Sequence, residues 1–464
     1  MKQVTYRGRG LLAFALLIAA LLSLRVTAAP AQRATEAAQL KQAISNLKAH
    51  DLGKAEAVLQ AILKRRPAQP DALNFMGVIR AEQKRFAEAE AFFQRAIQSA
   101  PRLVSAHLNL AYLYKQTGQP ARALAIFENA AKVFPAHPDI LFNLALLYAD
   151  RGDFPTAIKT LTAIPTTARP ADYWEVLARL QVTAGDFAKA EESLRQVLLQ
   201  KPDSITALRQ LAGVRLKLGD TPHAWEAIAQ ALRLAPNSTD LLYEFAQLSL
   251  QNQLAGEAVI AMRKALLLEA DRPEYLFLLG EALLNTEDYH PALTPFERYA
   301  QLRPADPRGH LYLGWTYYLE KDFDKARLHL DQCLKLNPEE TDAYYHLGVI
   351  AYEVGELGRA QELFAQVIRR QSAHARAHLG LGMVYAAQGQ YERARDALEA
   401  SARGDGDEPK VHYQLSQVYA RLGDLGRARQ EQQLYTEAQK RAKDKLRSSR
   451  QQPFTAAPRP DTRQ

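Results

Sequence analysis

Apolar residues recur through almost the whole chain in pairs of helical segments, and a short polar turn separates the two members of each pair. Within residues 104–133, apolar positions repeat at three- and four-residue spacing on both sides of such a turn, as on one face of an α-helix. They are Leu108, Leu110, Ala111 and Tyr114 before the turn, and Ala123, Ile126, Phe127 and Ala130 after it. The pattern predicts two amphipathic helices packed along their apolar faces.

This pair of segments occurs twelve times, at a spacing of 34 residues that shortens once to 33, between Ala157 and Ala190. The marker residues are Ala55, Ala89, Ala123, Ala157, Ala190, Ala224, Ala258, Ala292, Ala326, Ala360, Ala394 and Ala428. A second small position lies twelve residues before each marker, as in Gly280, Gly314 and Gly348. Small residues at both positions let paired helices approach closely, because larger side chains would force them apart.

The turns inside the repeats carry their own pattern. Glycine lies between the two predicted helices at Gly118, Gly152, Gly185, Gly219, Gly355, Gly389 and Gly423, and aspartate often follows it, as Asp153, Asp186, Asp220 and Asp424. Glycine can end a helix by adopting positive φ, and aspartate can cap the next one. Two repeats depart from the pattern: the fourth ends early at residues 164–167, and the eighth carries Pro291 and Pro295. Pro291 fits a first helical turn, whereas Pro295 is expected to kink or delay its helix.

The repeat resembles the tetratricopeptide repeat, a helix-turn-helix of 34 residues, over about residues 36–440. Its G-x-x-Y step is present in Gly314–Tyr317 and Gly382–Tyr385, and its consensus tryptophan appears only as Trp174. The resemblance implies an all-α fold, an α-solenoid of about twelve repeats that stack as a right-handed superhelix. Each repeat would bury its faces only against its neighbours.

The expected organisation has repeats one to four in residues 36–170, and repeats five to twelve with a polar C-terminal capping helix in residues 171–446. The early end of the fourth repeat is expected to bend the superhelix or divide it into two halves. Residues 447–464, rich in Ser, Gln, Pro and Arg, are expected to form a disordered basic tail.

The N-terminal residues have the pattern of an export signal. Residues 1–10 carry three positive charges, residues 11–24 are apolar except for Ser23, and residues 29–31 form an A-x-A site. This arrangement is typical of a signal peptide, residues 1–31, that is removed ahead of a short leader, residues 32–35. The mature protein is then expected in the periplasm or outside the cell, and an uncleaved segment would anchor it to the inner membrane.

Composition and charge limit the classes of function. The chain is 47% hydrophobic and 24% charged, as in a soluble folded protein, and its one cysteine, Cys333, excludes an intramolecular disulfide framework. Of the net charge of +8, the two ends account for the excess, because residues 34–435 carry −2. The folded part therefore has no net basic charge of the kind that nucleic-acid binding requires.

Candidate catalytic and metal-ligating residues are better explained by the repeat. The chain has no Walker loop, G-x-S-x-G or H-E-x-x-H motif, so no catalytic residue, cofactor or metal site is predicted. Four histidines share one repeat position, which indicates a structural role: His107, His310, His378 and His412. Cys333 falls at a small core position. Residues 405–408 are acidic but lack the rest of a calcium loop.

The resemblance implies that ligands lie along a concave groove lined by the first helix of each repeat. Asn109 and Asn143 occupy equivalent positions there and are similar to the asparagine ladder of the O-linked N-acetylglucosamine transferase repeats, which grips peptide backbone. Only two rungs are present, and no glycosyltransferase domain follows. The residues required for a carboxylate clamp are absent around both asparagines.

Repeats seven to eleven place large apolar residues at the positions implied to face the groove. They are Tyr243, Phe277, Trp315, Tyr318, Tyr345, Tyr352 and Met383. Tyrosine and tryptophan are frequent in binding hot spots, so these residues and the two asparagines are the predicted partner-binding residues. A tightly coiled superhelix could instead bury part of this stripe against itself.

Two functions follow from these observations. The first is a non-enzymatic scaffold that binds a peptide or protein segment in the groove during cell-envelope assembly or secretion. The second is an architectural subunit, of a homo-oligomer or of a membrane-associated envelope complex, that acts through its convex face or its ends. Stacking of sugar rings on the aromatic stripe also keeps a glycan or peptidoglycan ligand open.

Overall fold

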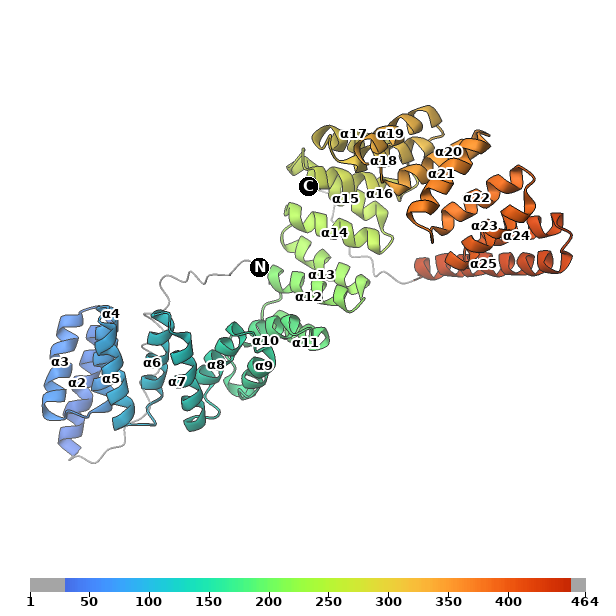
Figure 1. Cartoon of the computed structure of the whole chain (residues 1–464). Coiled ribbons are helices and arrows are strands. Elements are labelled where there is room, and N and C mark those ends of the chain that lie inside the picture. The colour runs from blue at the N-terminus through green and yellow to red at the C-terminus, as the bar shows by residue number, and fades with distance from the viewer. Residues whose placement is uncertain (1–29, 452–464) are drawn as a thin grey trace. The chain divides into compact units, whose positions relative to one another are not determined.

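The computed structural model describes residues 30–451, with side chains for residues 35–444. Within this range the chain is all-α, with twenty-four α-helices, two short 3-10 helices and no strand (Figure 1). Each successive pair of helices packs as a helix-turn-helix. The predicted all-α array of about twelve repeats is therefore confirmed.

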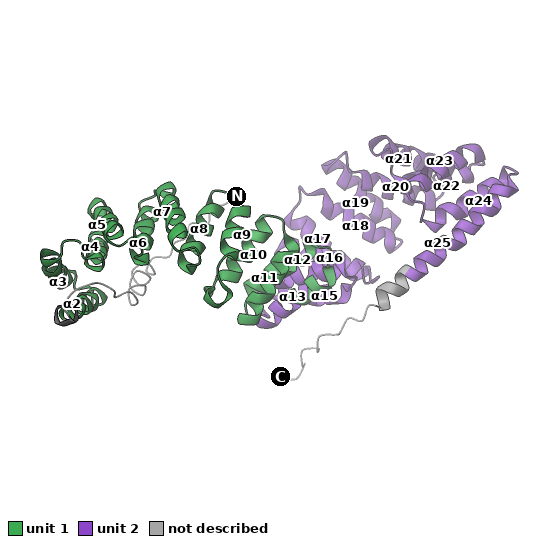
Figure 2. Ribbon diagram, turned by 90° about the horizontal axis from the view of Figure 1, so that it is seen from below, with its two compact units in different colours: residues 1–227 green, residues 228–464 purple. Residues whose placement is uncertain are grey.

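The chain forms two compact units, unit 1 (residues 1–227) and unit 2 (residues 228–464) (Figure 2). The helices of unit 1 are α2 (Pro30–Lys48), α3 (Leu52–Arg65), α4 (Pro70–Glu82), α5 (Phe86–Ser99), α6 (Val104–Gln116), α7 (Pro120–Val133), α8 (Pro138–Asp150), α9 (Phe154–Thr162), α10 (Tyr173–Thr183), α11 (Phe187–Gln200) and α12 (Ile205–Lys217), with the 3-10 helix η2 (Thr166–Ala168). Helix α13 (Thr221–Leu234) spans the boundary. The junction expected near residue 170 lies within unit 1, and a bend of the stack there stays a prediction.

Unit 2 continues the same alternation of first and second helices. Its helices are α14 (Thr239–Gln251), α15 (Ala255–Leu268), α16 (Pro273–Leu284), α17 (Leu293–Leu302), α18 (Pro307–Leu319), α19 (Phe323–Leu336), α20 (Thr341–Glu353), α21 (Leu357–Arg370), α22 (Ala375–Ala387), α23 (Tyr391–Gly404), α24 (Pro409–Arg421) and α25 (Leu425–Gln451), with the 3-10 helix η3 (His290–Ala292). The first helices α14, α16, α18, α20 and α22 carry the predicted aromatic stripe.

The small residues bring the two helices of a repeat into direct contact, as predicted. A Cβ atom added to Gly348 in α20 would lie 2.8 Å from Cε1 of Phe364 in α21, and one added to Gly280 in α16 would lie 2.4 Å from Cζ of Phe296 in α17. Phe296 and Phe364 are themselves fully buried. Each ring thus fills the space that the missing side chain leaves.

The turns within the repeats all use a left-handed backbone. Positive φ occurs at each of the seven predicted glycines, Gly118, Gly152, Gly185, Gly219, Gly355, Gly389 and Gly423, and at the equivalent residues of the other repeats, His50, Lys84, Gln253, Glu287 and Lys321. The predicted caps are also present, because Asp153, Asp186, Asp220 and Asp424 each accept a hydrogen bond from a backbone N–H three residues later. The turn chemistry that the sequence predicts is confirmed at every one of these positions.

The two irregular repeats have the expected local effects. Helix α9 stops after nine residues and is followed by η2. In the eighth repeat, η3 precedes α17, which starts only at Leu293. Pro295 therefore delays the helix that contains it.

The chain ends extend the regular structure. Helix α2 begins at Pro30, and α25 continues to Gln451, past the end expected at residue 446. The predicted signal peptide lies almost entirely outside the described residues. Among the helices described, none is both long enough and apolar enough to cross a membrane.

Candidate functional site

The predicted groove residues of unit 2, six aromatic residues and Met383, share one degree of exposure. All of them are half-buried: Tyr243, Phe277, Trp315, Tyr318, Tyr345, Tyr352 and Met383. Each side chain is therefore partly covered by its neighbours and keeps part of its surface accessible. Such a surface can bind a partner, because its residues are not fully buried in the core.

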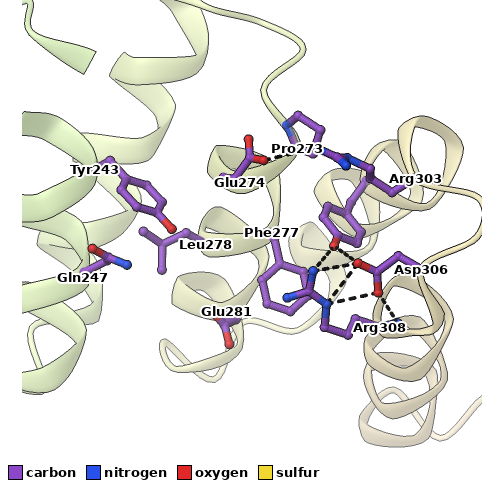
Figure 3. A pocket seen from close by; sticks show the side chains of 11 residues that line it. Tyr243, Gln247, Pro273, Glu274, Phe277, Leu278, Glu281, Arg303, Asp306 and Arg308 are labelled. Carbon is purple, nitrogen blue, oxygen red and sulfur yellow. Dashed lines mark hydrogen bonds and ion pairs between the residues drawn. The ribbon is translucent and has the colours of Figure 1, made fainter. Parts of the chain in front are cut away.

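A pocket of about 340 Å³ lies at the N-terminal end of this stripe, within unit 2. Figure 3 shows Tyr243 and Gln247 on one side of it and Asp306 and Arg308 on the other, with Phe277 and Leu278 between them. Glu274, Glu281, Tyr299, Arg303 and Pro273 complete the lining. The walls thus come from α14, α16 and α17 and from the start of α18.

The repeat explains why these side chains converge. Tyr243 and Phe277 are 34 residues apart and so hold equivalent positions on α14 and α16, and the same holds for Gln247 and Glu281. Successive first helices lie side by side in the stack, which places equivalent residues next to one another. Two of the predicted groove residues therefore line one pocket.

The wall near α18 is held by a network of hydrogen bonds. Tyr299 Oη donates to Asp306 Oδ2 over 2.6 Å, and Arg308 Nη2 lies 2.6 Å from the same oxygen. The guanidinium of Arg308 holds the pKa of Asp306 well below its usual range, and burial, with the hydrogen bond to Asp306, raises the pKa of Tyr299 to about 12. The guanidinium also lies 5.3 Å from the centroid of the Phe277 ring. The charges of Asp306 and Arg308 are thereby satisfied within the protein.

Glu281 differs from the other charged residues of the pocket. Its carboxylate accepts a hydrogen bond from Tyr312 Oη at 3.1 Å, and within the described part of the chain it forms no ion pair. Burial raises the pKa of Glu281. Glu274, in contrast, pairs with Arg303 at 3.3 Å. Arg308, already paired with Asp306, acts on Glu281 only at longer range, so Glu281 is the one carboxylate of this pocket without an ion pair among the described residues.

Aromatic contacts continue from the pocket along α18, α20 and α22. The ring centroids of Tyr312 and Trp315 are 5.9 Å apart, and Trp315 stacks on His346 at 5.8 Å. Tyr345 contacts His374 at 5.4 Å, and Arg376 lies 5.1 Å from the Tyr345 centroid. Side chains of consecutive repeats thus form a continuous aromatic face.

The remaining residues of the stripe have more specific partners. Tyr318 Oη donates to Glu353 at 2.6 Å, and Lys321 approaches both this carboxylate and the Tyr318 ring. Tyr352 packs against the core formed by α18 to α22, and Met383 against the core of α22 to α24. Tyr318 therefore links two repeats as well as contributing to the surface.

The two predicted asparagines of unit 1 are engaged within the fold. Asn109 is only 5% exposed, and its Nδ2 donates to Oδ1 of Asn74 at 3.0 Å. Asn143 is half-buried; its Nδ2 donates to Tyr112 Oη at 3.0 Å, and its Oδ1 accepts from Lys115 Nζ. Their position lies where neighbouring first helices touch, so Asn109 does not present its amide to a ligand as the asparagine ladder would require.

Residues that the sequence set aside have structural roles. His107, His378 and His412 each hydrogen-bond the carbonyl oxygen of the residue six positions earlier, which confirms that they belong to the repeat. Cys333 is fully buried, and burial raises its pKa to about 12. Glu408 caps α24 through the backbone N–H of Lys410. Among the residues described, no group of three or more potential ligands could hold a metal ion.

Several pocket residues were missed because aromatic character was the criterion for selection. Glu274, Arg308, Gln247 and Glu281 all occupy repeat positions that the family resemblance implies face the groove. The repeat spacing could therefore have identified these four residues as candidates. Asp306, Tyr299 and Arg303 lie outside those positions and were not detectable by it.

Comparisons with known proteins identify the type of repeat. Profiles described as tetratricopeptide repeat match residues 40–103, 114–180, 176–239, 307–340, 345–409 and 384–444, well over half of the chain. Among solved structures, yeast Tom70 is 15% identical with a TM-score of 0.42, over 82% of this chain and 97% of that one. A tetratricopeptide repeat protein from Parabacteroides merdae is 17% identical with a TM-score of 0.46, over 53% and 98%. No curated protein shows significant sequence similarity.

Proposed function

The chain belongs to the tetratricopeptide repeat family, whose members bind protein partners, and on this premise we propose that unit 2 binds an extended segment of a partner protein. The segment would lie along the first helices α14, α16, α18, α20 and α22. Its side chains would contact the half-buried aromatic residues and enter the pocket beside Tyr243.

One observation carries this proposal: the pocket and the aromatic face are continuous. Phe277, which lines the pocket, has its ring centroid 4.8 Å from that of Tyr312, and Tyr312 in turn contacts Trp315. Trp315 leads to His346 and Tyr345 on the next repeat. A surface that runs over successive repeats suits an extended segment better than a compact small molecule.

The proposal is tested with defined peptides. Random linear peptides displayed on phage are selected against the purified chain, and the most enriched peptide is synthesised with a fluorescent label. Fluorescence anisotropy then compares the wild type with the Trp315→Ala/Tyr345→Ala variant. Loss of two aromatic contacts, each of about 1 kcal/mol or more, is expected to weaken binding by at least about tenfold.

A matched control removes an exposed apolar side chain elsewhere in unit 2. Leu267 on α15 is 87% exposed, so Leu267→Ala should leave peptide affinity unchanged. Equal affinity of the wild type and the double aromatic variant, with both folds intact by circular dichroism, would contradict the proposal. An effect of Leu267→Ala alone would move the interface to the second helices and favour an architectural role.

We also propose that the chain acts after export, in the assembly of cell-envelope components or in secretion. The support is the sequence of residues 1–31, with its basic start, apolar middle and A-x-A end. N-terminal sequencing of the protein recovered from its native cell envelope should begin at Gln32, or at Ala29 if the alternative site is used. Recovery of the intact N-terminus from the cytoplasmic fraction would exclude export.

A further inference from the structure

An inward-facing aromatic ring is paired with an arginine of the following repeat twice in unit 2. Arg308 lies over Phe277 at 5.3 Å from the ring centroid, and Arg376 lies over Tyr345 at 5.1 Å. In both pairs the arginine follows the aromatic residue by 31 residues. The repeat geometry thus brings a guanidinium onto an aromatic ring at this pair of positions.

Tyr243 holds the same position as Phe277 and Tyr345, but a carboxylate replaces its arginine. The residue 31 positions after Tyr243 is Glu274, and within the described part of the chain no cation lies over the Tyr243 ring. Burial, followed by the carboxylates of Glu274 and Glu281, raises the pKa of Tyr243. The ring therefore lies beside two acidic groups where its equivalents lie beside a basic one.

The charged residues of the pocket also leave one acidic group without an ion pair. Five charged residues line it, and four of them form two ion pairs, Arg303 with Glu274 and Arg308 with Asp306. The fifth, Glu281, is half-buried; among the described residues its one hydrogen-bond donor is the Tyr312 hydroxyl, and Arg308 acts on it only at longer range. Enclosing this carboxylate beneath an apolar or acidic ligand group would leave a buried negative charge that is offset only by the more distant Arg308, itself paired with Asp306.

Building on the proposed function, we propose that this pocket takes a lysine or arginine side chain of the bound partner segment. The cation would lie against the Tyr243 ring and pair with Glu281. It would take the place that Arg308 and Arg376 occupy in the two equivalent positions. A volume of about 340 Å³ is at the lower end of the roughly 300–1,000 Å³ of ligand pockets, which suits one long side chain.

The test removes the negative charge of the pocket and the positive charge of the peptide separately. Phage-displayed random peptides are selected in parallel against the wild type and the Glu281→Gln variant, whose amide oxygen can still accept from Tyr312. The leading wild-type peptide is then compared with a copy in which its lysine or arginine is replaced by glutamine. We expect lysine or arginine to be enriched only on the wild type, and Glu281→Gln to weaken the basic peptide about tenfold while leaving the glutamine peptide unaffected.

A second variant supplies the cation beside Tyr243 from the chain itself. Glu274→Arg puts an arginine at the position that Arg308 and Arg376 occupy, so it is expected to cover Tyr243 and to reduce binding of the basic peptide at least as much as Glu281→Gln does. The control is Glu257→Gln on α15, which removes an exposed carboxylate outside the pocket and should leave affinity unchanged. Thermal melts confirm that each variant is folded.

The outcomes separate the two proposals. Selected peptides without a basic residue, or equal loss on Glu281→Gln for the basic and glutamine peptides, overturn the basic-side-chain pocket. If the Trp315→Ala/Tyr345→Ala variant still loses binding in that case, the proposed peptide-binding face stands. If neither the aromatic nor the acidic substitutions change affinity, both proposals fail.

Discussion

Lys84 and Gly118 occupy the same turn in consecutive repeats, and both backbones are left-handed, with φ of 61° for Lys84 and 72° for Gly118. Glycine adopts this conformation without strain, whereas a residue with a Cβ atom loses roughly 1–2 kcal/mol in it. Lys84 and Gly118 are both exposed, and a Cβ atom added to Gly118 would meet no atom within 4 Å. The two positions therefore differ in backbone strain but little in packing.

Replacing Lys84 with glycine should stabilise the chain. The relief of backbone strain exceeds the extra chain entropy of glycine in the unfolded state, so Lys84→Gly is expected to raise the free energy of unfolding by up to about 1 kcal/mol. The reverse change, Gly118→Lys, should lower it by about the same amount or more. Urea denaturation measures both, and a destabilised Lys84→Gly variant would show that the lysine side chain stabilises the turn.

Gly348 should not tolerate even one added carbon. Its Cβ would lie 2.8 Å from Phe364, so Gly348→Ala forces a buried ring out of place and is expected to lower the free energy of unfolding by about 1–3 kcal/mol. In the same unit, a Cβ atom added to Gly358 in α21 would meet no atom within 4 Å, and Gly358→Ala should be neutral or slightly stabilising. Equal melting of the two variants would contradict the close helix contact.

The repeat could be predicted almost completely from the sequence because its determinants are local. The spacing of small residues such as Gly348 and Ala360, the glycine turns and the aspartate caps all depend on residues within one repeat, and the structure has them where they were expected. Pro295 likewise acts within its own helix. The backbone turn at Lys84, in contrast, has no glycine to mark it and is visible only through its place in the repeat.

The binding surface was predicted less well because it depends on pairs of side chains from different repeats. The sequence indicated that Phe277 and Tyr243 share a face, but it did not indicate that Arg308 would cover one ring and not the other. Asn109 shows the opposite case. It fits a family pattern for ligand binding, yet its amide already donates a hydrogen bond to Asn74 of the preceding repeat.

Substitution of the two asparagines should therefore affect stability unequally. Asn109→Ala removes the amide that donates to Asn74 Oδ1, so this buried oxygen loses that hydrogen bond. The free energy of unfolding should therefore fall by about 1–3 kcal/mol. Asn143→Ala, at a half-buried site, should change it by less than about 1 kcal/mol. Chemical denaturation of both variants tests this order, and a stable Asn109→Ala protein would place its side chain outside the packing of unit 1.

Acid should destabilise unit 2 through a pair of histidines on α18 and α19. Nδ1 of His310 lies 3.0 Å from Nδ1 of His329, so one ring donates and the other accepts, which requires an unprotonated nitrogen. Burial, aided by His310, lowers the pKa of His329 from 6.5 to about 4. The unfolded chain consequently binds more protons than the folded chain between about pH 6.5 and 4.

The stabilisation that the neutral His329 provides is therefore complete above pH 6.5 and is lost as the pH falls toward 4. Because the ring is partly solvated, we expect a loss of about 1 kcal/mol from this residue. His329→Gln should lose less stability than the wild type between about pH 7 and pH 4.5 in urea denaturation, whereas His290→Gln, at a side chain that is 80% exposed, should follow the wild type. An identical pH dependence for all three proteins would mean that His329 is protonated equally in the folded and unfolded chains, and that its contact with His310 does not depend on the neutral ring.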